Sequence, residues 1–516
     1  MNLRYASFFL AALALGRAFS QSGTLDPTYG NAGISILQPG DFHDVSHDVI
    51  VLGDNTSLIC GVARAGGRNS IFIAHLLDDG SLDGSFGTSS GYTFFTIGEE
   101  AYGYALGIDS QGRIYATGIA YPTLAQAVVP LVRTDATGQP DPSFGTNGVL
   151  LLELSPTEAE ARDLAIINGD RVMLAGSAVG ADADRDAFIM RVLDDGTPDA
   201  TFGTDGVIFS GHDGDDALNS MVMMDDGAAV GAGYGTLNFV TKTFLFKVDS
   251  EGFPENAFSP TGIVMPDIAT NDHTAFGIAM EENRVFVTGW AGTMTGIDAY
   301  VAAVRNDGLF DPGFSGDGIA FINASEVDYG FDIVRYTNGD LIVCGSSGLG
   351  GFAAPRDFMV ARLTSSGDPV MSFGMNGVTL TSIQQDFDDA NAVAIELDGK
   401  LLLTGFTSGF STATDNDVAV ARYNVDWTLG TGSAVAYPTT VHPNPSSGDR
   451  IMLTHSAQAP AQVVLLDATG REARSYPSIQ PDAPASFSVA GLAEGRYTLR
   501  LQSAGQVWHH ALVIAR

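Results

Sequence analysis

A stretch of about 57 residues recurs through most of the chain, and no other feature limits the possible fold as strongly. Two landmarks identify its copies. A Phe-Gly or Tyr-Gly step, replaced by Phe-Ser at Phe258 and Phe314, comes every 56 to 59 residues, at Tyr29, Phe86, Phe144, Phe202, Phe258, Phe314 and Phe373. A glycine that closes a short apolar run falls at Gly61, Gly118, Gly176, Gly233, Gly289, Gly345 and Gly405. A period this steady indicates one supersecondary unit used seven times.

Each unit contains four short β-rich runs separated by turn residues. In one copy these runs are residues 332–336, 340–345, 357–363 and 372–380, and Asn338-Gly339 is a typical hairpin turn between the first two. No helical period competes with this pattern. Four antiparallel strands repeated seven times predict a seven-bladed β-propeller over residues 21–427.

The two ends of the repeat region complete each other. The segment LDPTYGNAGISIL is a lone copy of a fourth strand, whereas the seventh unit stops after its third strand near Tyr423. We therefore expect the N-terminal strand to pair with the last blade, which would leave no free sheet edge at the junction.

The repeat also carries a family resemblance. Asp141, Phe144, Gly145 and Gly148 form a D-x-x-F-G-x-x-G signature, and Asp398-Gly399-Lys400-Leu401 forms the turn that follows the apolar strand. These motifs resemble the delta-60 bacterial repeat family from Leu25 to about Asp426. The resemblance implies the propeller fold and supplies no catalytic residue.

Two recurring polar positions are expected to serve structure. A basic residue recurs in the third strand, at His75, Arg133, Arg191, Lys247, Arg362 and Arg422, with Ala303 as the exception. An aspartate recurs three residues before the Phe-Gly step, at Asp26, Asp83, Asp141, Asp199 and Asp311. Because one active site does not need six copies of a residue, we predict that the first set forms structural ion pairs or rim residues and that the second forms turn hydrogen bonds.

Composition and the N-terminus indicate export. Sixty acidic and 25 basic residues give a net charge of −35, which argues against nucleic-acid binding. Residues 1–20 combine Arg4, a short apolar run and small residues before Gln21, which is typical of a secretory signal peptide. No later stretch is long enough for a transmembrane helix. We expect a monomer, exported through the periplasm.

The two cysteines are predicted to remain free thiols. Cys60 and Cys344 occupy the same repeat position, each just before the landmark glycine. Symmetry would separate them by more than the roughly 7 Å that a disulfide permits between Cα atoms.

The C-terminal residues differ in composition and lack the period. A linker, 428–437, precedes residues 438–516, which read as short alternating strands of a small β-sandwich. This segment resembles the type A sorting domain of the type IX secretion system of Bacteroidetes through Pro443, Asn444, Pro445, Gly448, Asp467, Gly470, Gly495 and Tyr497. The resemblance implies that the type IX secretion machinery is a partner and that the protein is secreted or held on the outer cell surface.

Candidate ligand-binding residues lie in the loops of one propeller face. The outer-to-inner loops carry many carboxylates, including Asp44, Glu100, Glu160, Asp328 and Asp388. We select as ligand-face candidates Asp213, Asp215, His47, His212, His273 and Trp290. Asp182, Asp184 and Asp186 form the run that most resembles a set of metal ligands. Ca²⁺ is the one candidate cofactor, since it prefers several oxygen ligands.

Three functions remain open from the sequence. The first is a binding module for an extracellular polysaccharide or protein, with no catalytic residue assigned. The second is a carbohydrate-active hydrolase or lyase that uses funnel carboxylates, which would require two groups at a fixed separation. The third is a passive surface or matrix protein whose acidic face serves solubility alone.

Overall fold

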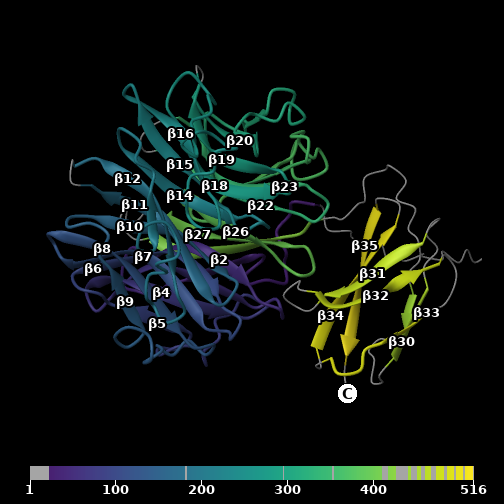
Figure 1. Ribbon diagram of the computed structural model, residues 1–516. Helices are drawn as coiled ribbons and strands as arrows, with labels where there is room; N and C mark the ends of the chain where they lie inside the picture. Colours follow the sequence, from purple (N-terminus) through teal and green to yellow (C-terminus); the bar gives the residue numbers. More distant parts are fainter. Residues whose placement is uncertain are drawn as a thin grey trace, which may run out of the picture. The chain divides into compact units, whose positions relative to one another are not determined.

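The computed structural model describes residues 22–180, 183–293, 296–350, 354–409 and 416–425, and, nearer the C-terminus, 440–442, 450–454, 460–466, 472–480, 485–492, 495–503 and 506–514. These residues form strands and turns, and they include no helix capable of crossing a membrane. The chain divides into two compact units, Met1–Asp426 and Trp427–Arg516 (Figure 1). The predicted signal peptide and linker lie outside the described residues. The prediction of an all-β propeller protein is confirmed.

Most strands of the first unit form groups of four antiparallel strands, which we call blades. Each blade is numbered from its first, inner strand to its fourth, outer strand. Four blades are β2–β5 (Val45–Val51, Ser57–Ala65, Arg68–Leu76, Tyr92–Phe95), β6–β9 (Glu100–Ile108, Ile114–Thr123, Gln126–Thr134, Val149–Leu152), β10–β13 (Ala159–Ile167, Arg171–Val179, Arg185–Val192, Val207–Phe209) and β14–β17 (Asp216–Met223, Ala229–Leu237, Val240–Val248, Ile263–Val264).

The remaining blades include the one that joins the two ends of the unit. They are β18–β21 (His273–Glu281, Arg284–Gly292, Ile297–Arg305, Ile319–Ile322), β22–β25 (Val327–Arg335, Leu341–Gly348, Arg356–Leu363, Val378–Thr381) and β26–β28 (Gln385–Ile395, Leu401–Gly409, Asn416–Tyr423) with β1 (Ile34–Leu37). β1 pairs antiparallel with β28, with Ile34 opposite Ala421. Because each inner strand contacts the next and β26 contacts β2, we interpret these groups as seven blades around one axis.

The strand bounds differ from the predicted runs at two places in the β22–β25 blade. β22 begins at Val327, five residues before the predicted 332, and β25 begins at Val378 rather than at 372. Residues 373–377 instead form the turn in which the Gly377 amide donates to the Phe373 carbonyl. The Phe-Gly step therefore belongs to a turn and not to the outer strand.

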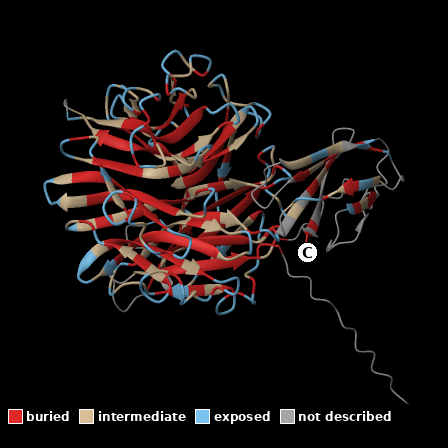
Figure 2. Cartoon of the chain, turned by 60° about the horizontal axis from the view of Figure 1, so that its bottom comes forward, coloured by how far each residue is buried: buried red, intermediate tan, exposed pale blue. Residues whose placement is uncertain are grey.

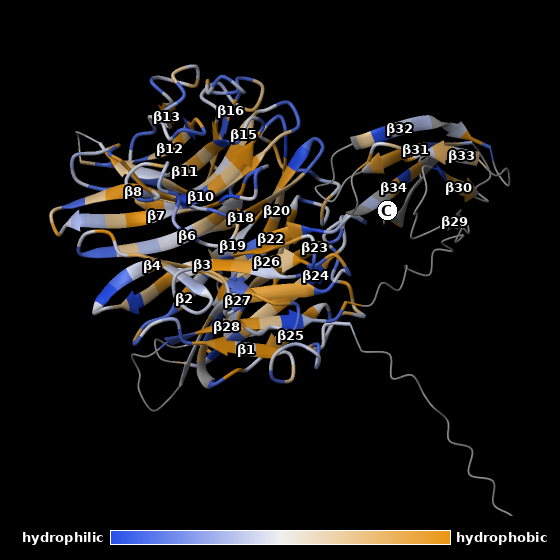
Figure 3. Cartoon of the chain, turned by 90° about the horizontal axis from the view of Figure 1, so that it is seen from below, coloured by the Kyte–Doolittle hydropathy of each residue, from blue (hydrophilic) through white to orange (hydrophobic). Residues whose placement is uncertain are grey.

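The core of the first unit lies between neighbouring blades. Leu131 of β8, Leu174 of β11 and Phe188 of β12 are fully buried in one apolar cluster that draws on two successive blades. Figures 2 and 3 show the same arrangement, with buried apolar strands and exposed polar turns. Removal of this apolar area from water stabilises the unit by roughly 25 cal/mol per Å².

The recurring basic residues and turn aspartates pair with one another. Arg133 Nε lies 2.8 Å from Asp141 Oδ2, and the Arg133 guanidinium stacks 4.3 Å from the centroid of the Phe144 ring. Asp141 Oδ1 meanwhile accepts the Ser143 amide of its own turn. Both structural predictions are therefore confirmed in this blade, and Arg191 with Asp199 repeats the arrangement.

Both cysteines are free, as predicted. Cys60 and Cys344 are fully buried, and no disulfide joins them. Burial raises the pKa of each thiol well above its ordinary value.

The second unit contains two sheets that share one apolar core. One sheet holds β29 (Thr440–His442), β30 (Arg450–Thr454) and β33 (Ala485–Ser488), and the other holds β31 (Ala461–Leu466), β32 (Glu472–Ile479), β34 (Gly495–Ser503) and β35 (Gln506–Ile514). Ile451 and Phe487 from the first sheet pack with Val463, Leu499 and Leu512 from the second, which makes the unit a small β-sandwich.

Two of the predicted sorting residues fall within described strands. Gly495 begins β34, and Tyr497 of the same strand packs against the sandwich core. The others, Pro443, Asn444, Pro445, Gly448, Asp467 and Gly470, lie outside the described residues.

Candidate functional site

The landmark glycines mark a β-bulge in each inner strand. Gly61 pairs with Ser46, and the register then shifts, so that His47 is the extra residue of β2. A Cβ atom on Gly61 would collide with the Val45 carbonyl oxygen of β2. The other landmark glycines face an inner-strand carbonyl in the same way. The repeat keeps glycine here because the bulge presses the inner backbone against the second strand.

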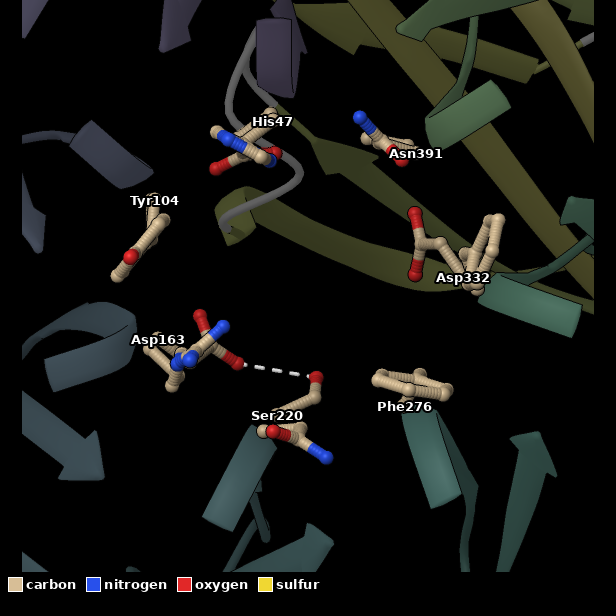
Figure 4. A pocket seen from close by; sticks show the side chains of 13 residues that line it. His47, Tyr104, Asp163, Ser220, Phe276, Asp332 and Asn391 are labelled. Atoms are coloured by element: carbon tan, nitrogen blue, oxygen red, sulfur yellow. Dashed lines mark hydrogen bonds between the residues drawn. The ribbon is translucent and has the colours of Figure 1, made fainter. Parts of the chain in front are cut away.

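The bulge directs one side chain of every blade into an axial channel. The channel has a volume of about 350 Å³. Its lining includes the bulged residues His47, Tyr104, Arg162, Asn219, Phe276, Phe331 and Asn391. Figure 4 shows several of these side chains around an open centre, with Phe276 across the channel from His47.

Three aspartates next to the bulges bind neighbouring blades together. Asp48 Oδ1 accepts the Val49 amide of its own strand, and its Oδ2 accepts the Leu106 amide of the next blade at 2.7 Å. Asp163 bridges to Met221 in the same way, and Asp332 bridges to Val393. Each carboxyl group thus joins one pair of blades, and the three pairs account for six of the seven blades. The remaining blade, β18–β21, has Gly277 at this position.

The other blade junctions around the channel use different contacts. Asn219 Nδ2 donates to the Ala275 carbonyl at 2.8 Å, and Asn391 Nδ2 donates to the Ser46 carbonyl at 2.9 Å. The Arg162 guanidinium stacks 4.5 Å from the Tyr104 ring centroid. The Phe276 and Phe331 rings meet edge to face at 5.5 Å. Every pair of neighbouring blades therefore has a contact at the channel wall.

Protein surrounds the titratable groups of the channel, and this shifts their pKa values. The pKa of Asp48 is raised to about 8, mainly by burial. The hydrogen bond from the Leu106 amide acts to lower this pKa, and the negative charges of Asp163 and Asp332 act to raise it. Burial also raises the pKa of Asp163, to about 6, and that of Asp332. Burial and the charge of Arg162 lower the pKa of His47 to about 4. Near pH 7, His47 is neutral and Asp48 is mostly protonated.

Aromatic side chains cover one side of the channel and continue away from it. The Tyr329 and Phe331 rings are nearly parallel, with centroids 5.9 Å apart, and Phe331 contacts Phe276. Trp290 of β19 meets Tyr329 edge to face at 6.4 Å. We call Phe276, Phe331, Tyr329 and Trp290 the aromatic wall. All four side chains are partly exposed.

The structure places only one of the predicted ligand-face residues in the channel. His47 lines it, and Trp290 ends the aromatic wall. Asp213 and Asp215 are exposed, and Asp215 accepts the Arg185 amide at 2.9 Å. His212 Nδ1 lies 3.6 Å from Asp216 Oδ2 and does not line the channel.

His273 is unsuited to the ligand contact suggested for it. Its side chain is fully buried, and its Nδ1 accepts the Thr243 amide of β16 at 2.9 Å. Burial lowers the pKa of His273 to about 4, so the ring is neutral near pH 7. The same repeat position holds Asp216 in the preceding blade, whose Oδ1 accepts the Ala187 amide. His273 therefore holds two blades together.

Several loop carboxylates also serve the backbone rather than a ligand. Asp44, Asp328 and Asp388 are buried, and each accepts an amide of the loop before it, from Gly40, Ala324 and Ile383 respectively. Glu100 and Glu160 lie within β6 and β10. Part of the acidic face expected from the sequence is thus interior, whereas Asp213 and Asp215 are exposed.

The suggested calcium run is only partly described. Asp182 lies outside the described residues, Asp184 precedes β12, and Asp186 is within β12. Among the side chains that the structure describes, no three His, Cys, Asp or Glu residues are grouped to hold a metal ion. The calcium site remains a prediction.

Sequence reasoning missed most of the channel. Tyr104, Arg162, Asn219, Phe276, Phe331 and Asn391 were not selected, because no motif contains them. They nevertheless lie a fixed 13 or 14 residues before the landmark glycines. A search for the repeat position with the most varied chemistry would have found them.

Comparisons with known proteins give a family match over a short segment. Residues 397–431 match the model of a family that is described as a domain of unknown function (DUF5122) beta-propeller. No curated protein matches the chain.

Solved structures give distant matches. An ulvan lyase of a polysaccharide lyase family has a TM-score of 0.39 at 11% identity, over 79% of this chain and 94% of that one. A Dyadobacter fermentans protein of unknown function has a TM-score of 0.38 at 8% identity, over 77% and 100%. Sqt1 from Chaetomium thermophilum has a TM-score of 0.37 at 12% identity, over 72% and 82%. At these scores the matches say nothing about function.

Proposed function

We propose that the propeller unit is a binding module and that its ligand enters the axial channel. One observation carries this proposal. At a single repeat position the seven blades present five kinds of side chain, whereas the landmark glycine beside it never changes. A scaffold alone would not require such variety. Different chemistry on each side of one channel suits a single asymmetric ligand, and loops and bulges on rigid sheets commonly carry such sites.

The size of the channel supports a small ligand or a small group of a larger one. Its volume of about 350 Å³ is at the lower end of the range for ligand pockets, roughly 300–1,000 Å³. The lining combines aromatic rings with amides, an imidazole and a guanidinium. Such sites bind through apolar contact and fix orientation through a few polar groups.

The carboxylates of the channel favour binding over catalysis. Asp48, Asp163 and Asp332 each accept amides from two blades, so their oxygens already maintain the blade contacts. A glycoside hydrolase would need two carboxylates free to exchange protons with a substrate. The release of products in the assay below would favour the enzyme instead.

The binding test compares two tryptophan substitutions. Asn219→Trp would fill the channel, whereas Leu124→Trp adds the same ring at a side chain that is 85% exposed. Both full-length variants and the wild type are applied to immobilised extracellular polysaccharides and proteins, with retention and released products measured. We expect Asn219→Trp alone to abolish retention. Equal retention of both variants would contradict a channel ligand, and no retention of any form would favour a passive surface protein.

We further propose export through the type IX secretion machinery to the cell surface or the medium. The signal-like residues 1–20 and the sorting motif around Pro443 and Tyr497 support this proposal. Deletion of residues 438–516 should then leave the protein in the periplasm of a host with that machinery. Appearance of the deleted form in the medium would contradict it.

A further inference from the structure

We propose that the channel ligand is a neutral saccharide, which packs a sugar ring on the aromatic wall and hydrogen-bonds through its hydroxyls to Asn219 and Asn391. This inference rests on the proposed binding function and names its ligand class. The inference is based on the position of Phe276 and Phe331 of the aromatic wall in the same channel as the two amides.

The aromatic wall offers apolar faces at an otherwise polar site. Phe276 and Phe331 line the channel, and Tyr329 continues the surface with a ring tilted only 6° from that of Phe331. Phe276 and Phe331 are partly exposed in the channel, so part of their surface remains for a ligand, whereas the Arg356 guanidinium lies over the Tyr329 ring. The C–H face of a sugar ring is apolar while its edge carries hydroxyls, and aromatic rings suit ligands that are apolar on one side and polar on the other.

The two asparagines are held in place and keep an acceptor each. Their Nδ2 atoms donate to the Ala275 and Ser46 carbonyls, which fixes the amide planes. Among the described residues, no protein donor reaches either Oδ1 atom. A fixed carbonyl oxygen requires a donor from the ligand, and sugar hydroxyls provide donors. A carboxylate or sulfate group provides none.

Charge also favours a neutral ligand. Asp163 lines the channel, and its pKa of about 6 leaves it mostly ionised near pH 7, so it would repel an anion. Among the described residues of the lining, Arg162 is the one cation, and it lies 3.1 Å from Glu160, so its charge is already paired. Neutral His47 can donate and accept hydrogen bonds with hydroxyls. A uronic or sulfated sugar would therefore bind less well than its neutral counterpart.

The ligand class is tested by calorimetric titration of the full chain. The probes are neutral oligosaccharides of glucose, galactose, mannose and xylose, with uronic-acid oligosaccharides of equal length. We expect at least one neutral probe to bind and Phe331→Ala to weaken it about fivefold, since lost aromatic contact costs roughly 1 kcal/mol. Phe321→Ala removes a phenylalanine that is 45% exposed on β21 and should leave affinity unchanged.

The asparagines give an independent arm. Asn219→Asp keeps the acceptor and adds a charge, so neutral probes should still bind, although more weakly because the link to Ala275 is lost. Asn219→Leu removes the acceptor and should weaken binding by a further factor of about five to ten. Thermal unfolding of each variant confirms that it folds.

The outcomes separate the two proposals. If only uronic probes bind, and Phe331→Ala and Asn219→Trp weaken them, the channel binds ligands but the neutral-saccharide inference is wrong. If a protein binds in the channel and no saccharide does, the inference is also overturned. If binding occurs and no channel substitution affects it, both the inference and the proposed function fail.

Discussion

Arg422 Nε lies 2.9 Å from Asp26 Oδ2, and this buried ion pair joins residues 396 positions apart. Asp26 belongs to the N-terminal segment that leads into β1, and Arg422 belongs to β28. Both side chains are only 4% exposed. The Arg422 guanidinium also stacks 4.7 Å from the Tyr29 ring centroid. Arg191 and Asp199 form the same kind of ion pair within one blade, whereas Arg422 and Asp26 form it between the two ends of the unit.

Asp26→Ala should destabilise the propeller unit by about 3–5 kcal/mol, because it leaves Arg422 buried without this partner. Chemical denaturation of the full chain measures the change in free energy of unfolding. Asp199→Ala is the matched control, since it breaks an equivalent pair inside a continuous blade. Only Asp26→Ala should also speed proteolysis between residues 22 and 37, because only that change loosens the joining strand. Equal proteolysis of both variants would contradict this closure.

The turn aspartates predict a loss of stability in acid. Hydrogen bonds from Ser85 and His75 lower the pKa of Asp83 to about 2. For Asp26, burial acts to raise the pKa, but the bonds from Thr28 and the charge of Arg422 outweigh it and lower the value. A lowered folded pKa means that the stabilisation is complete above the unfolded value near 4 and is lost as the pH falls toward 2. Free energies of unfolding measured from pH 6 to 2 should fall, and Asp83→Asn should fall less steeply.

Asp48 predicts the opposite slope at alkaline pH. Its raised pKa of about 8 means that the folded state holds a proton that the unfolded state has lost. The resulting stabilisation is complete below the unfolded value near 4 and is lost as the pH rises through 8. Between pH 7 and 9 we expect a loss on the order of 1 kcal/mol. Asp48→Ala places at this position the residue that the next blade has there, Ala105. This variant should be less stable at pH 7 but should lack this slope. An unchanged slope would contradict the assignment.

The fold was largely predictable from the sequence, and the site was not. Local turn and strand chemistry gives the repeat, so Gly61 and its copies and the structural roles of Arg133 and Asp141 could be predicted, although their pairing with each other was not. The channel depends on a bulge, and a bulge changes where His47 points without leaving a motif. Buried and exposed acids are also alike in sequence. Asp328 and Asp213 were both expected in polar loops, yet Asp328 lies in β22 and is fully buried, whereas Asp213 is exposed.

The cysteines should be inert in the folded protein. Cys60 and Cys344 are fully buried, and burial raises the pKa of each thiol well above its ordinary value. Because the thiolate is the reactive form, a thiol-specific reagent should label neither cysteine in native buffer and both in denaturant. Mass spectrometry counts the labels. Native labelling of either cysteine would show that its blade opens locally.

The blade β18–β21 predicts a compensating pair. Ala303 replaces the usual basic residue, and Arg284 of β19 takes over its contacts, with Nη1 2.6 Å from Asp311 Oδ2 and the guanidinium 4.7 Å from the Phe286 ring centroid. Arg284→Ala should cost about 2–3 kcal/mol, since Asp311 loses a charged partner. Ala303→Arg alone should also destabilise, because Ala303 is fully buried opposite Phe286, whose ring the Arg284 guanidinium already covers. The double variant restores the arrangement of the other blades and should recover at least half of the summed loss in chemical denaturation. Strict additivity of the two single changes would show that the two positions do not share one role.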